Sequence, residues 1–260
     1  MTPLLWGATG LVMAAGGWRL ASAPRPLLRR TLTLLLHLAY RLRFRGRGGI
    51  PASGPAIVVC NHVSFMDALV VGVASPRPLR FLMDKPIYDS PWLNWLFRRV
   101  GAIPVDADRR DPGSVRQALA EVSRALRQGE VVMVFPEGRL TPDGEIQPFR
   151  RGLELILARD AVPVIPAGLA GLWGSWTSHQ GGKALTRPPR RFRARVALYF
   201  GEAMSPGEAS RQRITERVCA LKAEADAWAE PVRRRDGAAP GRRRRCSEDE
   251  ADGRGADRSG

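Results

Sequence analysis

The chain has 260 residues, and its 41 lysines and arginines against 25 aspartates and glutamates give a formal net charge of +16. This length suits one large domain with a substantial core, and the charge suits an anionic partner, either nucleic acid or an anionic membrane surface. The three cysteines, Cys60, Cys219 and Cys246, lie far apart, which excludes the spacing of a zinc finger or a redox pair.

The first 45 residues predict a helical, membrane-associated region. Met1 to Trp18 carries no charge, and a second apolar run extends from Leu32 to Tyr40. Basic residues crowd behind both runs, so the positive-inside rule predicts that this side faces the cytoplasm. The first run is close to the length of a spanning helix, and we expect a membrane anchor or a re-entrant pair of helices. An amphipathic helix packed on the domain is the alternative.

Residues 46–230 predict an α/β domain, entered through a Gly/Pro-rich joint at residues 46–55. Short apolar runs alternate with longer segments of helical periodicity. This alternation is typical of a mixed, largely parallel central sheet flanked by helices. The predicted strands are Ala56–Cys60, Leu79–Met83, Ala102–Val105, Val131–Phe135, Val162–Leu169 and Arg195–Gly201, and the predicted helices are Ser64–Ala74, Pro91–Arg98, Pro112–Gln128, Gly152–Ala158 and Pro206–Ala229.

Residues 231–260 differ from the rest of the chain. They contain two arginine clusters, Arg233 to Arg235 and Arg242 to Arg245, followed by an acidic and glycine-rich end, and they have almost no apolar side chains. Such a segment cannot bury enough apolar surface to fold, so a disordered tail is predicted.

The segment Asn61-His62-Val63-Ser64-Phe65-Met66-Asp67 follows the first predicted strand directly. The chain has three histidines, and only His62 has a carboxylate so near. Histidine is suited to proton transfer near neutral pH, and an aspartate can fix its tautomer and stabilise its cation. The segment therefore predicts general-base chemistry at the end of a buried strand.

Three further segments accompany this one. Phe135-Pro136-Glu137-Gly138-Arg139-Leu140-Thr141 follows a strand at the edge where α/β sheets place ligands, and an arginine there can bind phosphate through two hydrogen bonds. A surface loop with a local ion pair is the alternative.

Pro163 and Pro166 interrupt an apolar run, which indicates an edge or bulged strand. This strand is either simple core or the wall of an apolar channel. Residues 101–110 end in two acids and two arginines, which a solvated turn explains equally well.

In this order and spacing the four segments resemble the glycerolipid acyltransferase family, which includes 1-acylglycerol-3-phosphate acyltransferase, and the resemblance covers residues 45–206. It implies an α/β domain that transfers a fatty acyl group from acyl-CoA or acyl carrier protein to a glycerophosphate hydroxyl. It also implies that His62 is the catalytic base and Asp67 its orienting carboxylate, with Asn61 and Ser64 in supporting positions. The remaining implied residues are Glu137, Gly138 and Arg139 for the acceptor phosphate, and Pro166 in a late apolar segment.

One departure from the family leaves the acceptor open. Many members have an arginine directly after the aspartate at position 106, but here Ala107 follows Asp106. Arg109 or Arg110 is expected to substitute, unless the acceptor headgroup differs. Pro148 to Gly152 and Leu172 to Ser175 look like the subgroup that reacylates 2-acylglycerophosphoethanolamine, which also tends to lack that arginine.

The sequence therefore predicts a membrane-associated O-acyltransferase of the cytoplasmic side of the inner membrane. The expected acceptor is 1-acylglycerol-3-phosphate or another lysophospholipid such as 2-acylglycerophosphoethanolamine. Direct transfer is predicted because the chain has no G-x-S-x-G nucleophile motif, and backbone N–H groups at the start of the Ser64 helix are the expected oxyanion donors. We expect no cofactor and no metal, and an anionic membrane surface and acyl carrier protein as partners. A nucleic-acid-binding protein is one alternative, but no nucleic-acid-binding motif accompanies the arginines. A non-catalytic membrane scaffold is the other alternative.

Overall fold

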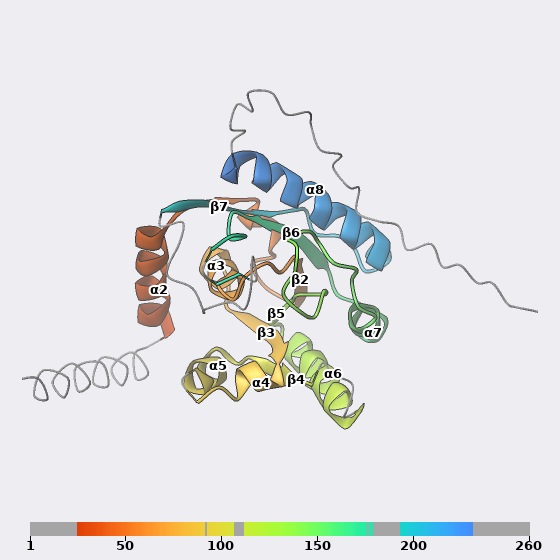
Figure 1. The fold of residues 1–260 in the computed structure, drawn as a ribbon. Coiled ribbons are helices and arrows are strands. Elements are labelled where there is room, and N and C mark those ends of the chain that lie inside the picture. Colours follow the sequence, from red (N-terminus) through yellow and green to blue (C-terminus); the bar gives the residue numbers. More distant parts are fainter. Residues whose placement is uncertain (1–24, 92, 107–111, 176, 179–192, 231–260) are drawn as a thin grey trace, which may run out of the picture.

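The computed structural model describes residues 25–91, 93–106, 112–175, 177–178 and 193–230. A seven-stranded sheet runs through it in the order β1-β7-β6-β2-β5-β3-β4 (Figure 1). All neighbouring strands are parallel except β6 and β7, which confirms the predicted mixed, largely parallel sheet. The strands are β1 (Tyr40–Arg45), β2 (Ala56–Cys60), β3 (Leu79–Asp84), β4 (Ile103–Val105), β5 (Val131–Val134), β6 (Val164–Ala170) and β7 (Ala194–Phe200).

Helices cover both faces of the sheet. One face packs against α2 and α3, and the other packs against α6, α7 and α8. The strands β2, β5 and β6 are uniformly apolar because both of their faces are buried. Along β2, for example, Val58 and Cys60 face one layer while Ile57 and Val59 face the other. The helices are α2 (Arg25–Ala39), α3 (Asp67–Ala74), α4 (Lys85–Tyr88), α5 (Asn94–Val100), α6 (Pro112–Arg127), α7 (Gly152–Arg159) and α8 (Arg211–Ala229), with a short 3-10 turn at Arg47–Gly49.

The predicted helical region of residues 1–45 is wrong over its last six residues, which form β1. Tyr40, Leu42 and Phe44 alternate with arginines in this segment, and that two-residue period is the pattern of a strand. The apolar members pack on the core beside α2, and the strand adds to the edge of the sheet by pairing with β7.

Of the two predictions for Val162–Leu169, an edge or a bulged strand, the edge position is wrong. β6 lies between β7 and β2, and all seven of its residues are buried. The prolines fit there because their carbonyls still accept ladder hydrogen bonds: Pro163 accepts from Ile57 N at 3.0 Å, and Pro166 accepts from Gly201 N at 2.8 Å. Burial on both faces agrees with the interpretation of this segment as simple core.

The apolar run from Leu32 to Tyr40 is divided between α2 and the start of β1. Leu36 is buried, whereas Leu34, Leu35 and Leu38 are 52–61% exposed. No helix in the described part of the chain is long and apolar enough to cross a membrane. The predicted anchor at Met1 to Trp18 and the predicted disordered tail at 231–260 lie outside the described residues.

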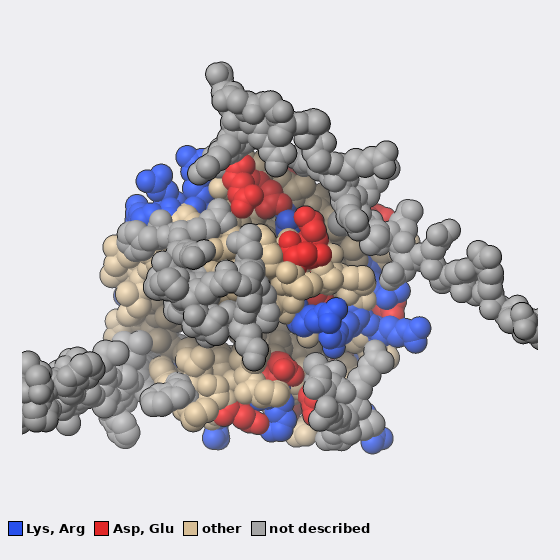
Figure 2. All heavy atoms as spheres, viewed as in Figure 1, with Lys and Arg blue, Asp and Glu red and all other residues tan. Residues whose placement is uncertain are grey.

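Charged side chains of both signs are interspersed over the described part of the face shown in Figure 2. A group of lysine and arginine side chains gathers there in the region where α7 lies in Figure 1.

Candidate active site

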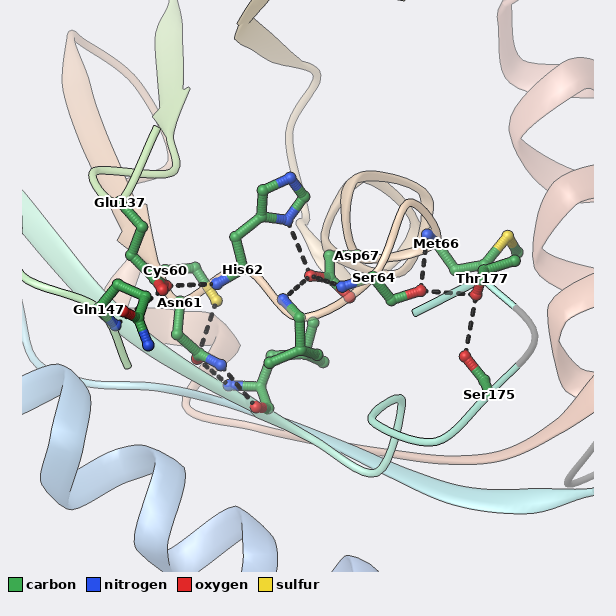
Figure 3. A network of polar contacts seen from close by, with 12 residues as sticks. Cys60, Asn61, His62, Ser64, Met66, Asp67, Glu137, Gln147, Ser175 and Thr177 are labelled. Atoms are coloured by element: carbon green, nitrogen blue, oxygen red, sulfur yellow. Dashed lines mark hydrogen bonds and ion pairs between the residues drawn. The ribbon is translucent and has the colours of Figure 1, made fainter. Parts of the chain in front are cut away.

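The His62–Asp67 pair lies at the carboxyl end of β2, where the chain turns into α3 (Figure 3). His62 Nδ1 is 2.9 Å from Asp67 Oδ2. The same oxygen accepts the main-chain N–H groups of Val63 at 2.6 Å and Ser64 at 2.8 Å. The predicted helix starts three residues later than expected, at Asp67, because residues 63 and 64 curl around this carboxylate instead of entering the helix.

The surroundings of Asp67 determine which nitrogen of His62 carries a proton. Asp67 is fully buried, and burial raises the pKa of its carboxyl, against the hydrogen bonds from His62, Ser64 and Val63, which lower it. Because Oδ2 accepts hydrogen bonds, Nδ1 of His62 carries the proton and Nε2 is left with a free electron pair. The imidazole is 17% exposed, so Nε2 can receive a proton from a bound molecule.

The Asn61 side chain connects the start of this turn to β6 through hydrogen bonds. Its Nδ2 donates to the Leu169 carbonyl at 3.0 Å, and its Oδ1 accepts from Leu169 N at 2.8 Å. The side-chain amide therefore continues the hydrogen bonding between β2 and β6 beyond the point where the backbone of β2 turns away. This geometry gives Asn61 a positioning role.

Ser64 connects the turn to the loop after β6 through a chain of buried hydroxyls. Ser64 Oγ lies 2.6 Å from Thr177 Oγ1, which lies 2.9 Å from Ser175 Oγ (Figure 3). The Thr177 carbonyl also accepts Phe65 N at 3.2 Å. Sequence reasoning missed Thr177, because nothing local to residue 177 indicates that it meets residue 64.

The expected oxyanion donors are already engaged. Every main-chain N–H from residue 63 to residue 67 has an acceptor within the protein: Asp67 Oδ2 for Val63 and Ser64, the Thr177 carbonyl for Phe65, and Ser64 Oγ and O for Met66 and Asp67. The expectation that this stretch supplies the oxyanion hole does not fit the structure.

Glu137 is buried beneath the base and does not face an acceptor. Its Oε1 accepts His62 N at 2.7 Å, and its Oε2 accepts Gln147 N at 2.9 Å. The side chain is 2% exposed, and burial raises the pKa of its carboxyl from the ordinary value of 4.5 to about 7. Both oxygens are occupied by the main chain, so the assignment of Glu137 to phosphate binding disagrees with this geometry.

The same loop contacts His62 at two more points. Thr141 N donates to the His62 carbonyl at 3.0 Å, and the Phe135 ring stacks on the imidazole with centroids 4.1 Å apart and planes 15° from parallel. Sequence reasoning singled out this segment but not these two residues, since neither side chain has catalytic chemistry of its own.

The remaining predicted phosphate ligands have different outcomes. Arg139 is exposed, and no hydrogen bond or ion pair joins it to another described residue. Gly138 adopts a left-handed conformation with φ 66°, which favours glycine, and the Arg150 side chain passes over it. Arg109 and Arg110 lie outside the described residues.

An apolar cavity of about 760 Å³ adjoins α3. It lies between α2, α3, β3 and the α5 segment, and its lining includes Leu32, Leu69, Gly72, Phe81 and Leu96. Leu69 is two residues beyond Asp67 along the chain, so the cavity begins next to the segment that carries the base.

Comparisons with known proteins agree with this geometry. The sequence pattern of the family described as Acyltransferase matches residues 41–170, half of the chain. A 1-acyl-sn-glycerol-3-phosphate acyltransferase of Bacillus subtilis is 24% identical over 191 residues, which are 73% of this chain and 87% of that protein. The alpha form of the same enzyme from Homo sapiens is 33% identical over 138 residues, 51% of this chain and 48% of that protein.

Other similar proteins differ in acceptor or in coverage. A lyso-ornithine lipid O-acyltransferase of Rhodobacter capsulatus is 28% identical over 128 residues, 49% of this chain and 43% of that protein. The chain thus spans most of the Bacillus protein but about half or less of these others. The crystal structure of a 1-acyl-sn-glycerophosphate acyltransferase from Thermotoga maritima superposes with a TM-score of 0.63, at 22% identity, over 88% of this chain and 94% of that one, so the two share a fold.

Proposed function

Because the chain belongs to the acyltransferase family and is an acyltransferase, we propose that it moves a fatty acyl group from a thioester to the free hydroxyl of a lysophospholipid, with 1-acylglycerol-3-phosphate as acceptor and phosphatidic acid as product. The observation that carries the proposal is the His62–Asp67 contact of 2.9 Å, which leaves Nε2 available at the carboxyl edge of the sheet. The names of the Bacillus and human relatives support the acceptor.

The reaction is a direct transfer from donor to acceptor. Nε2 of His62 takes the proton of the acceptor hydroxyl as its oxygen attacks the thioester carbonyl. The new C–O bond forms, the C–S bond breaks, and the imidazolium returns the proton to the departing thiolate. Asp67 stabilises the imidazolium in between. A positioned base of this kind contributes about 10²–10⁴-fold to the rate, and the donor is acyl-CoA or acyl carrier protein.

The apolar cavity beside α3 supports the choice of a long-chain substrate. We propose that it receives a fatty acyl chain, since burying methylene groups against side chains such as Leu69 and Phe81 removes apolar surface from water.

The exposed leucines of α2 support a membrane location. We propose that this helix contacts the cytoplasmic face of the inner membrane, where both lipid substrate and product reside. A helix that exposes large apolar side chains gains free energy by placing them at the boundary between headgroups and acyl chains.

Thioester consumption with a panel of lysophospholipids tests the reaction. Wild type should release thiol with 1-acylglycerol-3-phosphate, His62→Ala should release none above background, and Asp67→Asn should lose at least about 100-fold in kcat. Circular dichroism controls for folding. A folded, fully active His62→Ala variant contradicts the mechanism. A wild type that consumes no thioester with any acceptor contradicts the function and favours a non-catalytic membrane scaffold, whereas a preference for 2-acylglycerophosphoethanolamine replaces only the acceptor.

A further inference from the structure

The side chain of Arg150 passes close to Gly138. A Cβ at position 138 would be 2.7 Å from Arg150 Nε, 2.8 Å from Cδ and 3.0 Å from Cζ, so a side chain there would displace the Arg150 side chain. The absence of a side chain at residue 138 thus leaves the guanidinium room to pass over this loop. The closeness of this crossing distinguishes Arg150 from an arginine that merely extends into solvent.

The main chain of Arg150 is held in place, while its charged group has no partner among the described residues. Arg150 N donates to the Pro136 carbonyl at 2.8 Å, and the neighbouring Phe149 is anchored in the core at 4% exposure. Among the described residues, the guanidinium donates no hydrogen bond and forms no ion pair. A cation on a fixed main chain, with no partner among the residues that the structure describes, is suited to an anionic ligand.

The crossing point is close to the base. Gly138 directly follows Glu137, whose carboxylate is 2.7 Å from His62 N, and precedes Thr141, whose N–H is 3.0 Å from the His62 carbonyl. The loop that carries Gly138 therefore wraps around His62. In 1-acylglycerol-3-phosphate the phosphate sits on the carbon next to the one with the free hydroxyl, so a ligand for that phosphate must lie near the base.

We propose that Arg150 binds the acceptor phosphate together with Arg139. This inference rests on the proposed function. It assigns to Arg150 the phosphate-binding role of the arginine that many family members have directly after the aspartate at position 106. Arg139 is the residue after Gly138, is exposed and is likewise without a described partner. Two guanidinium groups on one loop can each offer paired N–H donors to a phosphate monoester.

Arg150→Gln is the test, and Arg151→Gln is its matched control. Arg151 is adjacent, exposed and without a described partner, so its replacement removes the same charge from the same surface. We expect Arg150→Gln to raise the KM for 1-acylglycerol-3-phosphate about ten- to a hundredfold, with the KM for the thioester unchanged. Inorganic phosphate should compete with the acceptor in wild type and compete less well in Arg150→Gln.

Gly138→Ala provides a second variant, because a methyl group there displaces Arg150 without removing its charge. It should raise the acceptor KM in the same direction if the variant folds. Equal acceptor KM values for Arg150→Gln and Arg151→Gln, in an active protein, overturn this inference and leave the proposed function standing. If wild type transfers no acyl group to any acceptor, the proposed function fails and this inference fails with it.

Discussion

His62 is held at four separate points, and only one of them involves Asp67, its partner in the proposed mechanism. Asp67 binds the ring nitrogen, Phe135 stacks on the ring face, Glu137 accepts the main-chain N–H and Thr141 donates to the carbonyl. Each contact removes a different freedom of the base. A base fixed in this way loses little entropy when the acceptor arrives, which is how positioning lowers the barrier to transfer.

The buried carboxyl of Glu137 predicts a specific pH dependence of stability. Its pKa is about 7 in the folded protein against an ordinary 4.5, because burial disfavours the charged form. The unfolded chain therefore loses this proton at lower pH than the folded protein. The contribution of Glu137 to the free energy of unfolding is complete below about pH 4.5 and falls by about 3 kcal/mol as the pH rises to about 7.

Glu137→Gln should remove this fall, as urea unfolding at a series of pH values would measure. The variant should also lower kcat. The carboxylate accepts two main-chain N–H groups, and the NH₂ of the glutamine amide would face one of them as a second donor. The lost hydrogen bond costs about 1–3 kcal/mol and loosens the main chain at His62. Exposed Glu224→Gln is the control. If it alters the pH dependence as much as Glu137→Gln does, the buried carboxyl is not the source.

How far the site could be predicted depended on the distance between residues along the chain. The His62–Asp67 pair was predictable because five residues and a preceding strand fix its geometry locally. The role of Glu137 was not, since a glutamate beside an arginine reads as a surface ion pair unless its burial is known. That burial arises only when β5 pairs with β2 and brings residue 137 beneath residue 62.

At the scale of elements, β6 and α8 approach each other closely. A Cβ at Gly168 would collide with the main chain of Leu221 and Lys222, so the helix rests directly on the strand at this point. The next residue, Leu169, binds the Asn61 side chain at the active site. Packing of α8 is therefore connected to the turn that carries the base.

Gly168→Ala should destabilise the protein by about 1–3 kcal/mol, because the added methyl forces strand and helix apart. Chemical denaturation measures this loss. Gly207→Ala is the control, since a Cβ at Gly207 meets nothing within 4 Å. Equal stabilities for the two variants would show that β6 and α8 can separate without cost.

The cavity beside α3 gives a second prediction at this scale. Leu69→Trp should fill part of its volume of about 760 Å³ and shift the preference among thioesters toward shorter acyl chains. Relative kcat/KM values across a series of chain lengths measure the shift. An unchanged profile in an active variant would mean that the chain binds elsewhere.

Alternation of apolar runs predicted the sheet, and each of the six predicted strands has a counterpart. β1 was missed because a run of leucines followed by arginines also fits a membrane helix with a basic flank. β6 was predicted to be an edge or bulged strand because proline usually cannot continue a ladder. Its central position depends on pairings with β2 and β7, which are distant in sequence.

At the scale of the whole molecule, the apolar surface of α2 is the main feature on which membrane binding is proposed. Leu34 and Leu38 are 61% and 55% exposed on one helix. Large apolar side chains exposed together are typical of an interaction site. The net charge of +16 would add attraction to an anionic surface, and that attraction weakens as salt screens it.

Leu34→Asn combined with Leu38→Asn should weaken binding to vesicles that contain anionic lipid by at least about tenfold, since each leucine forfeits part of its burial. Co-sedimentation measures binding. Leu155→Asn is the control, because Leu155 is 51% exposed but lies on α7, on the opposite face of the sheet. Equal weakening by both variants would contradict a specific role for α2.

The strand order has a consequence for the timing of synthesis. The base is translated early, at residue 62, but the two strands that flank β2 are residues 131–134 and 164–170. Until both strands have left the ribosome, β2 has neither neighbour. Neither the Glu137 carboxylate nor the backbone of Leu169 can then hold the turn at residues 61–62. From residue 62 until residue 170 has emerged, the nascent chain therefore lacks the contacts that fix His62, and the proposed competence for acyl transfer appears only when the second half of the sheet closes around it.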